Sequence, residues 1–317
     1  GGESFDSETL AVCRARNSRG SVLVINGFDR VAAPLSIQGD SVAGFYNEYD
    51  SGVAYLSDIS FIGSQHNFDR RLSRSENDNY ALGASYADYE TEVIAGNTFD
   101  FVALHGESIV EAGYSFSSAS RRAVEAGDVA LKGYDVVDLL LGKQRTTMVG
   151  RGAMEYKYVA YGEAMQRELK HYLSSGGALF VSGSYGLTDL WTAPTATDAD
   201  RRFAEEVLHV AFGGDRATRR GDVRAVPSSF TQKRFDVEFN TELNDEIYSV
   251  ESPEVVQPKG KGATTVMRYA AAGQSAAVAY SGAYRSFVAG FPFETIIDSE
   301  ERDVLMAAVL KYLTKRK

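Results

Sequence analysis

The stretch that most constrains the fold is a helix pattern that runs into two glycines and a short apolar segment, within residues 161–186. Apolar residues recur at helical spacing along its first part: Tyr161, Met165, Leu169, Tyr172 and Leu173. Gly176 and Gly177 follow, and glycine commonly ends a helix. The run Ala178–Val181 then predicts a short strand that is buried on both faces. A helix, a tight turn and a buried strand form half of a β-α-β crossover, so the sequence predicts a parallel sheet.

Other apolar runs bounded by turn residues predict further strands: residues 21–25, 134–141, 264–270, 275–281 and 284–291. The last three are joined by tight turns, which is typical of a β-meander. Helices are predicted at residues 117–126 and 203–211, and a surface loop at 252–262. Asp298 and Glu301 form a capping box that opens a final helix. We therefore expect an α/β fold with three layers, α/β/α, in which a mostly parallel central sheet is followed by a C-terminal β-meander and helix.

Two long segments do not follow this alternation. Residues 1–16 resemble the last turn and strand of a preceding fibronectin type III module, and the alternative is an edge strand of the main domain. We expect residues 17–317 to form a single α/β domain. Residues 31–108 are rich in aromatic, acidic and turn residues without a clean period. Such long stretches are usually functional or disordered, and the aromatic content argues against disorder. We expect an ordered insertion over the carboxyl edge of the sheet.

Composition excludes several classes of function. The formal net charge of −10 argues against a nucleic-acid surface, which needs clustered Lys and Arg. No apolar run approaches the roughly 20 residues of a membrane span. The single cysteine, Cys13, excludes an internal disulfide and a cysteine-rich zinc site. The first strand ends at Asn26-Gly27-Phe28-Asp29, which lacks the spaced glycines of a nucleotide-binding turn, so we expect no cofactor.

The turn Ser182–Gly186 carries the strongest catalytic candidate. It places Ser184 between a strand and a helix, close to the G-x-S-x-G pattern that exposes a nucleophilic serine. Activation requires a base, and His66 and His105 are the candidates, oriented by Glu294, Asp29 or Glu107. The alternative is that small residues at this turn are a steric requirement. The same histidines with Asp69 or Glu107 match no recognised zinc spacing, so we expect no metal site.

Polar side chains also follow several predicted strands. Asn26, Asp29, Gln144 and Glu294 come after strand ends, where parallel strands place their ligands, and they converge with Ser184 at one edge. The carboxylates there could perform acid–base chemistry on glycosides. The alternative for Glu294 is hydrogen bonding to backbone amides of its loop. Further binding candidates lie in the insertion and after the central turn: Gln65, Asn97 and Asp189.

Four short motifs carry a family resemblance: Val22–Arg30, Ala95–Asp100, Gly142–Gln144 and Gly290–Glu294. They resemble secreted, multidomain gut-bacterial proteins labelled xanthan lyases or N-acetylmuramoyl-alanine amidases, over residues 20–315. The core also resembles the class I glutamine-amidotransferase-like, flavodoxin-like fold, whose nucleophile is a cysteine where this chain has Ser184. The resemblance implies a secreted or cell-surface location and other modules in the same chain.

The same resemblance implies that the partner is a polysaccharide or a peptidoglycan fragment. Because no complete catalytic set is evident, we expect a domain that acts on or binds polysaccharide or cell wall without catalysis of its own. The alternative hypothesis is an amidase-like or esterase-like hydrolase that uses Ser184 with His105 or His66.

Overall fold

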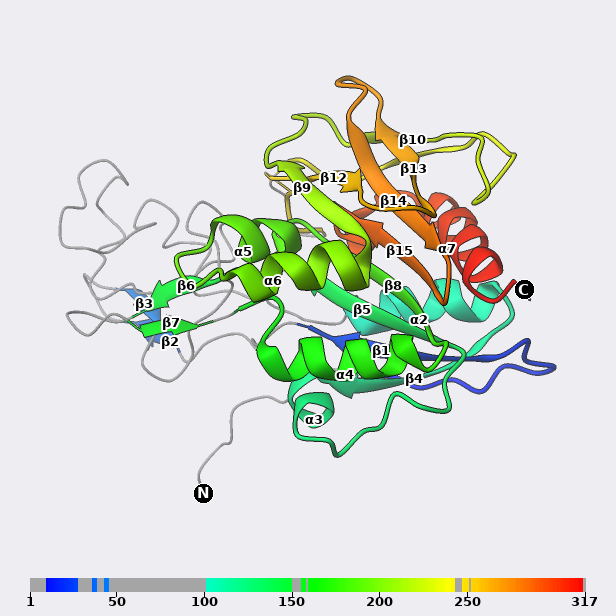
Figure 1. The fold of residues 1–317 in the computed structure, drawn as a ribbon, viewed down its shortest axis with the longest axis horizontal. Coiled ribbons are helices and arrows are strands. Elements are labelled where there is room, and N and C mark those ends of the chain that lie inside the picture. The colour runs from blue at the N-terminus through cyan, green and yellow to red at the C-terminus, as the bar shows by residue number, and fades with distance from the viewer. Residues whose placement is uncertain are drawn as a thin grey trace.

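A computed structural model describes residues 10–27, 36–38, 43–45, 101–149, 155–157, 159–242, 247–250 and 252–315. These residues build a nine-stranded sheet (Figure 1). Its strands, in spatial order, are β11 (Asp236–Glu238), β10 (Asp222–Ala225), β13 (Ala263–Tyr269), β14 (Ser275–Ser281), β15 (Arg285–Ala289), β8 (Ala178–Gly183), β5 (Val136–Gly142), β1 (Ser21–Asn26) and β4 (Ser115–Ser120). The strands predicted at residues 21–25, 134–141 and 178–181 are therefore confirmed as adjacent strands of one sheet, in which β1 is next to the edge strand β4.

The sheet is parallel from β15 to β4 and antiparallel from β15 to β11. In the parallel part Val24 lies beside Asp138, and Asp138 lies beside Phe180. The antiparallel part contains the predicted meander β13-β14-β15, which joins the parallel part because β15 pairs with β8. The carboxyl ends of β1, β5, β8 and β15 consequently meet at the same edge.

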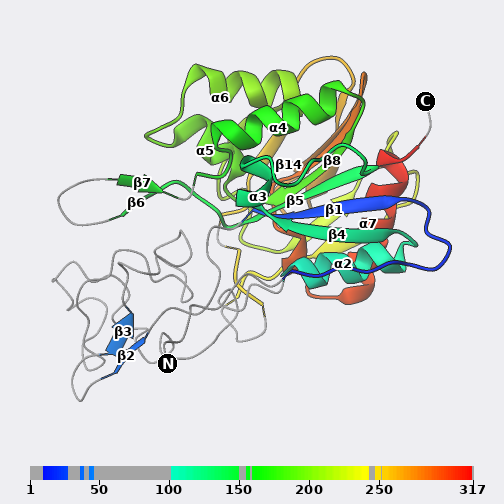
Figure 2. The same ribbon diagram turned by 90° about the horizontal axis from the view of Figure 1, so that it is seen from below.

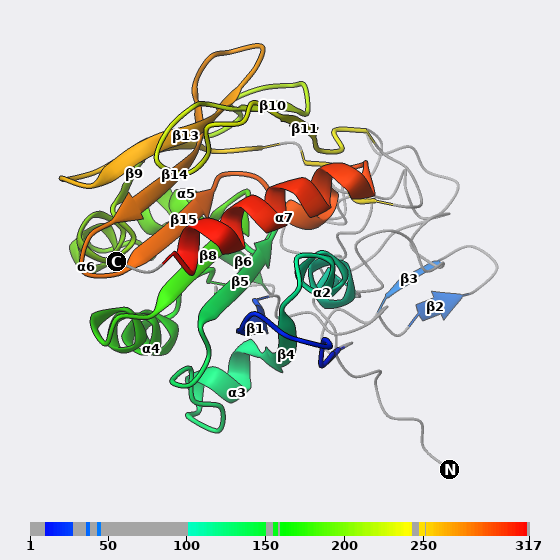
Figure 3. The ribbon, with the colours of Figure 1, turned by 90° about the vertical axis from the view of Figure 1, so that its right-hand side faces the viewer.

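Helices cover both faces of the sheet, which confirms the three-layer α/β/α architecture (Figures 2 and 3). On one face lie α2 (Phe101–Glu111) and α7 (Ser299–Leu313). On the other lie α3 (Arg121–Glu125), α4 (Glu163–Ser174), α5 (Gly186–Thr192) and α6 (Asp198–Arg202). The side chains of successive strand residues pack into the hydrophobic cores on opposite faces of the sheet. Phe180 packs in the core under α2 and α7, whereas Val181 packs under α4.

The central helix α4 and the turn after it form as the sequence predicts. Its apolar stripe is buried, and the helix ends before Gly176, which has a φ of 93°. A side chain at Gly177 would begin 2.5 Å from the ring of Tyr172, so this position also requires glycine. The Tyr172 hydroxyl donates to the carbonyl oxygen of Ala178, which fastens the helix to the first residue of β8.

Three predicted elements differ in the structure. Residues 117–120 belong to β4, and the helix begins only at Arg121 because the Ser120 side chain accepts a hydrogen bond from the Ala123 amide as its N-cap. The helical segment after α6 is a π-helix, η2 (Phe203–Leu208), which ends at left-handed His209. Val210 and Ala211 therefore lie in β9 (Val210–Gly214), which pairs with β12 (Val255–Pro258). Part of the predicted loop 252–262 is thus a strand.

The insertion is described only in part. It contains a hairpin of β2 (Ser36–Gln38) and β3 (Ala43–Phe45). A separate hairpin of β6 (Thr147–Val149) and β7 (Glu155–Lys157) follows β5, outside the insertion. Residues 101–108, which the sequence placed at the end of the insertion, instead start α2, which packs on β1 and β4. In the N-terminal segment, Cys13 forms an antiparallel bridge with Phe116 of β4.

The final helix begins at the predicted cap. The Asp298 carboxylate accepts hydrogen bonds from the amides of Glu300 and Glu301. The Glu301 carboxylate accepts from the Glu238 amide of β11 instead of closing the capping box. This cap therefore also fixes the helix to the edge of the sheet. Within the part of the chain described, no helix combines the length and apolar character that crossing a membrane requires.

Candidate functional site

The carboxyl ends of four neighbouring parallel strands hold four of the predicted site residues. Asn26 ends β1, Gln144 follows β5, and Ser184 follows β8. Glu294 lies after β15 in the 3₁₀-helix η3 (Phe293–Thr295). Each of these four side chains is at most 3% exposed. The structure therefore brings them to one edge, as predicted, but beneath the surface.

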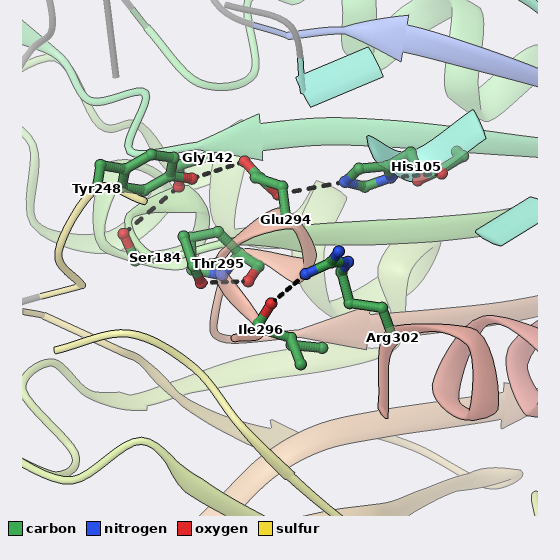
Figure 4. Close-up of polar contacts among 10 residues, drawn as sticks. His105, Gly142, Ser184, Tyr248, Glu294, Thr295, Ile296 and Arg302 are labelled. Atoms are coloured by element: carbon green, nitrogen blue, oxygen red, sulfur yellow. Dashed lines mark hydrogen bonds and ion pairs between the residues drawn. The ribbon is translucent and has the colours of Figure 1, made fainter. Parts of the chain in front are cut away.

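The centre of the site is a buried histidine held between two carboxylates, of which Figure 4 labels that of Glu294. Nδ1 of His105 lies 2.7 Å from Oδ2 of Asp138, and Nε2 lies 3.2 Å from Oε2 of Glu294. The three residues come from α2, the middle of β5 and η3. Burying a carboxylate is costly unless it is paired, and His105 provides the partner for both.

Local structure explains how His105 reaches this position. It lies on the buried face of α2 with Val102 and Ile109, which belong to the turns before and after it on the same stripe. The next residue, Gly106, lets the helix approach β4, because a Cβ there would lie 2.1 Å from the Phe116 ring. The ring of Phe293 packs edge-on against His105 at 4.7 Å between centroids.

The surroundings determine the protonation state of His105. Burial by itself would lower the pKa of His105, but the charge and hydrogen bond of Asp138, together with those of Glu294, outweigh it and raise the pKa to about 9. At neutral pH the ring is therefore an imidazolium, and both N–H groups donate to carboxylates. An imidazolium has no free lone pair, so His105 in this state cannot accept a proton from a serine.

Two further side chains extend the cluster toward the edge. The hydroxyl of Tyr248 donates to Oε1 of Glu294 at 2.6 Å, so both oxygens of this carboxylate have a partner (Figure 4). Lys143, in the turn after β5, donates from Nζ to the Ser249 carbonyl oxygen at 2.9 Å and is 1% exposed. Its Nζ lies 5.7 Å from the centre of the Tyr248 ring. The network therefore links Asp138, on β5, with the segment that carries Tyr248.

Ser184 stands apart from the histidine. Its amide donates to the Gly142 carbonyl oxygen at 2.9 Å, and its hydroxyl donates to the same oxygen at 3.4 Å. The preceding Gly183 is confined, since a Cβ there would lie 2.8 Å from Cβ of Leu141. These contacts fit the steric explanation of the small-residue turn. The hydrogen bond between Ser184 and His105 that a catalytic dyad requires is not present among these contacts.

The backbone amides in the first turn of α5 have a hydrogen-bond partner within the protein. The buried carboxylate of Glu254, just before β12, accepts hydrogen bonds from the amides of Leu187 and Thr188. Burial raises the pKa of Glu254 to about 7, against the lowering effect of these hydrogen bonds. Amides that could stabilise negative charge near Ser184 are thus occupied by an internal carboxyl group.

Asp189 anchors two loops. Its carboxylate accepts from the amide and hydroxyl of Thr146 and from the amide of Ala160, at 2.8–3.0 Å. Burial raises the pKa of Asp189 to about 6. These donors occupy a side chain that the sequence suggested for ligand binding.

Several predicted residues lie elsewhere than the sequence suggested. His105 lies in the middle of a helix, not in a loop, and Glu107 is exposed on the outer side of that helix. Glu294 bonds two side chains, so its expected role in binding backbone amides is wrong. Further candidates lie outside the described residues: Asp29, Gln65, His66, Asp69 and Asn97. Within the described ranges, no cluster of three His, Cys, Asp or Glu residues is arranged to hold a metal.

Asp138, Tyr248 and the buried position of Lys143 were not predicted from the sequence. For Asp138 a signal existed, because it interrupts the apolar run of a strand that is buried on both faces. A carboxylate in such a place needs a buried partner. No comparable signal marks Tyr248, whose loop gives no periodic pattern.

Comparisons with known proteins give distant similarities. No family model matches the chain, and no curated protein matches it. An exo-β-1,4-mannosidase from Opitutaceae bacterium strain TAV5 has 10% identity and a TM-score of 0.42, over 70% of this chain and 33% of the mannosidase. The chain thus spans about a third of that enzyme.

Two further similar structures come from Thermoplasma acidophilum and Thermotoga maritima. A protein from Thermoplasma acidophilum that is described as a subunit of GMP synthase has 10% identity and a TM-score of 0.40, over 66% of this chain and 86% of that one. A glutamine amidotransferase from Thermotoga maritima has 14% identity and a TM-score of 0.37, over 66% of this chain and 91% of that one.

Proposed function

We propose that this chain is a non-catalytic α/β domain of a secreted or cell-surface protein, and that it binds polysaccharide or peptidoglycan at the carboxyl edge of its sheet. The observation that carries the proposal is the state of His105. As an imidazolium between Asp138 and Glu294 it cannot serve Ser184 as a base. The remaining polar groups at the edge are suited to recognition.

The chemistry of the edge supports a sugar ligand. Amide and hydroxyl side chains, those of Asn26, Gln144 and Ser184, lie just beneath this edge, and groups of these kinds pair with the donors and acceptors of sugar hydroxyls. Residues 31–100 add many tyrosines, phenylalanines and acids in sequence, and aromatic faces stack on sugar rings. A modular, secreted parent protein, suggested by the sequence resemblance, would place such a domain next to polysaccharide.

Affinity electrophoresis tests the proposal directly. The chain is run through gels that contain neutral or acidic polysaccharides, and it is sedimented with insoluble peptidoglycan. We expect retardation or co-sedimentation with at least one of them, and binding at least tenfold weaker in Gln144→Ala. The control is Gln232→Ala, since Gln232 is exposed in the loop between β10 and β11. Absence of binding to every polymer, or equal binding by both variants, contradicts the proposal.

A hydrolase that uses Ser184 is the alternative. The observation that favours it is the position of Ser184 in a tight turn between β8 and α5, where a nucleophilic serine can stand. Its base would be His66, which lies outside the described residues. A fluorophosphonate probe separates the two functions, because it labels activated serines. The binding proposal expects no labelling, whereas labelling that Ser184→Ala abolishes would support the hydrolase.

A further inference from the structure

Arg285 lies at the end of the sheet opposite to the candidate site. It is the first residue of β15 and is paired with Ala178, the first residue of β8, at the amino ends of the parallel strands. Its guanidinium lies over the ring of Tyr312 on α7, with Cζ 5.7 Å from the ring centre. Nη1 donates to the carbonyl oxygen of Lys315, just beyond α7. These contacts hold the guanidinium in place, and the hydrogen bond uses only one of its three nitrogen atoms.

The other edge of the guanidinium, Nε and Nη2, has no acceptor in the described part of the chain. Nε is fully enclosed and makes no hydrogen bond. Nη2 makes none either, but it is not fully enclosed, since the side chain as a whole is half-buried. Arginine is always charged in proteins, and burying a charge without a partner is costly. Arg285 therefore carries a charge that no described carboxylate balances.

A second polar group without a hydrogen bond lies close to this edge. The hydroxyl of Tyr312 is buried and has no hydrogen-bond partner among the described residues. Burial raises the pKa of Tyr312, whereas the charge of Arg285 and the side chain of Ser281 act against the rise. Ser281 is thus near the hydroxyl but not in hydrogen-bonding geometry. Two elements, β15 and α7, consequently bring unused N–H and O–H donors into one small region.

We propose that Arg285 and Tyr312 form a binding site for a small oxyanion at the amino edge of the sheet. Nε and Nη2 of an arginine are a planar pair of donors that matches two oxygen atoms of a sulfate, phosphate or carboxylate group. The protein itself uses Nη1, so the edge suited to bidentate binding is the one that remains. The Tyr312 hydroxyl supplies a further donor. Lys311, in the last turn of α7, offsets the negative end of the helix dipole there.

This inference does not rest on the proposed function, which concerns the carboxyl edge of the sheet. The same oxyanion chemistry has two sources, a free inorganic anion and the acid group of a sugar. Sulfate and glucuronate therefore serve as separate probes. Binding of sulfate alone indicates an inorganic anion, and binding of glucuronate alone indicates an acidic sugar.

NMR spectroscopy of the arginine Nε–H groups tests the site directly. The isotope-labelled chain in chloride buffer is titrated with sodium sulfate or sodium glucuronate at constant ionic strength. We expect the Nε–H resonance of Arg285 to shift with at least one probe and to saturate with a Kd of about 1 mM or below. Arg224 is the control in the same sample, because its Nε and Nη2 already donate to the carboxylate of Asp236. No shift at Arg285 with either probe overturns the proposal.

Two variants separate binding from folding. Arg285→Lys keeps the charge but loses the planar pair of donors, so the affinity should fall at least tenfold. Tyr312→Phe removes a hydroxyl that has no partner. In chloride this variant should therefore unfold at the wild-type temperature or above, while its affinity for the anion falls at least threefold.

The matched control is Tyr114→Phe. The hydroxyl of Tyr114 pairs with Oγ1 of Thr314 at 2.8 Å, beside the same end of α7. Tyr114→Phe should therefore lose stability and still bind the anion as the wild type does. Equal affinity in the wild type and Arg285→Lys overturns the site. A destabilised Tyr312→Phe with wild-type affinity also overturns it, because the hydroxyl would then already have a partner other than the anion.

Discussion

His105 shows how one residue determines what a site can do. A histidine beside a serine turn invites a catalytic interpretation, but the role of a histidine depends on what its two nitrogens contact. Here both contact buried carboxylates, so the ring is a cation that balances Asp138 and Glu294. Complete buried ion sets are tolerated, and incomplete ones are strongly destabilising. The arrangement therefore stabilises the fold only when all its members are present.

Asp138→Asn tests this balance at a single atom. The change removes one of the two negative charges that hold the His105 imidazolium, without altering the size of the side chain. We expect the free energy of unfolding to fall by about 3–5 kcal/mol, the usual cost of breaking a buried ion pair. We also expect the pKa of His105 to fall, because Asp138 makes the largest contribution that raises it. Urea unfolding and NMR titration of the ring measure the two effects.

The matched control is Asp236→Asn. Asp236 also pairs with a cation, Arg224, but the pair bridges β10 and β11 in water, with both side chains more than half exposed. Exposed pairs contribute little to stability, so this variant should unfold close to the wild type. If the free energy of unfolding falls equally in Asp138→Asn and Asp236→Asn, the buried cluster stabilises the protein no more than an exposed ion pair does.

At the scale of elements, β8 is an inner strand of the parallel part of the sheet. It lies between parallel β5 and parallel β15, and its residues are buried alternately under α2 and α7 and under α4. A charge on either face of such a strand has no partner and no route to water.

Val181→Asp should therefore prevent folding. Val181 is 2% exposed under α4, and an unpaired carboxylate there costs several kcal/mol against a total stability of roughly 5–15 kcal/mol. Val304→Asp is the control, because Val304 lies on α7 and is 48% exposed. Circular dichroism and thermal unfolding should show a native-like control and an unfolded or strongly destabilised Val181→Asp. A soluble Val181→Asp with the wild-type melting temperature would contradict this placement.

The elements also show what the sequence could and could not predict. β1, β5, β8, α4 and α7 were predictable because each carries its own periodic pattern or cap within a few residues. β9 and β12 were not predictable, since each is short and is stabilised by pairing with a segment about 40 residues away in the chain. In the site, too, only part of the arrangement was predictable from the sequence. Convergence of strand ends was predictable from topology, whereas the contact between His105 and Glu294 spans 189 residues and left no local spacing.

At the scale of the molecule, three buried groups shift their proton equilibria in the same direction. The pKa of Asp189 is raised to about 6 and that of Glu254 to about 7, in both cases chiefly because burial disfavours the charged carboxylate. The pKa of His105 is raised to about 9, because its two carboxylates outweigh the effect of burial. Asp189 and Glu254 support α5 on one face of the sheet, and His105 lies on the other. Groups on both faces of the sheet therefore change the free energy of unfolding in the same direction as the pH changes.

We expect the free energy of unfolding to decrease as the pH rises from about 5 to 9. A raised pKa means that the folded protein holds a proton which the unfolded chain has already lost, so rising pH favours the unfolded chain. The contribution of His105 is complete below its unfolded value of 6.5 and is lost by about pH 9, which corresponds to about 3 kcal/mol. Glu254 acts earlier, and its contribution is lost as the pH rises from 4.5 through about 7.

Urea unfolding at pH 5, 7 and 9 measures this dependence, and two variants assign it to residues. His105→Gln should flatten the decrease between pH 7 and 9, because glutamine does not titrate, and leave the decrease between pH 5 and 7 in place. Glu254→Gln should do the reverse. Slopes are compared rather than absolute stabilities, since each variant also loses a buried contact. A wild-type protein that becomes more stable from pH 5 to 9 would show that His105 is not held as a cation, and a neutral His105 would again be a candidate base for Ser184.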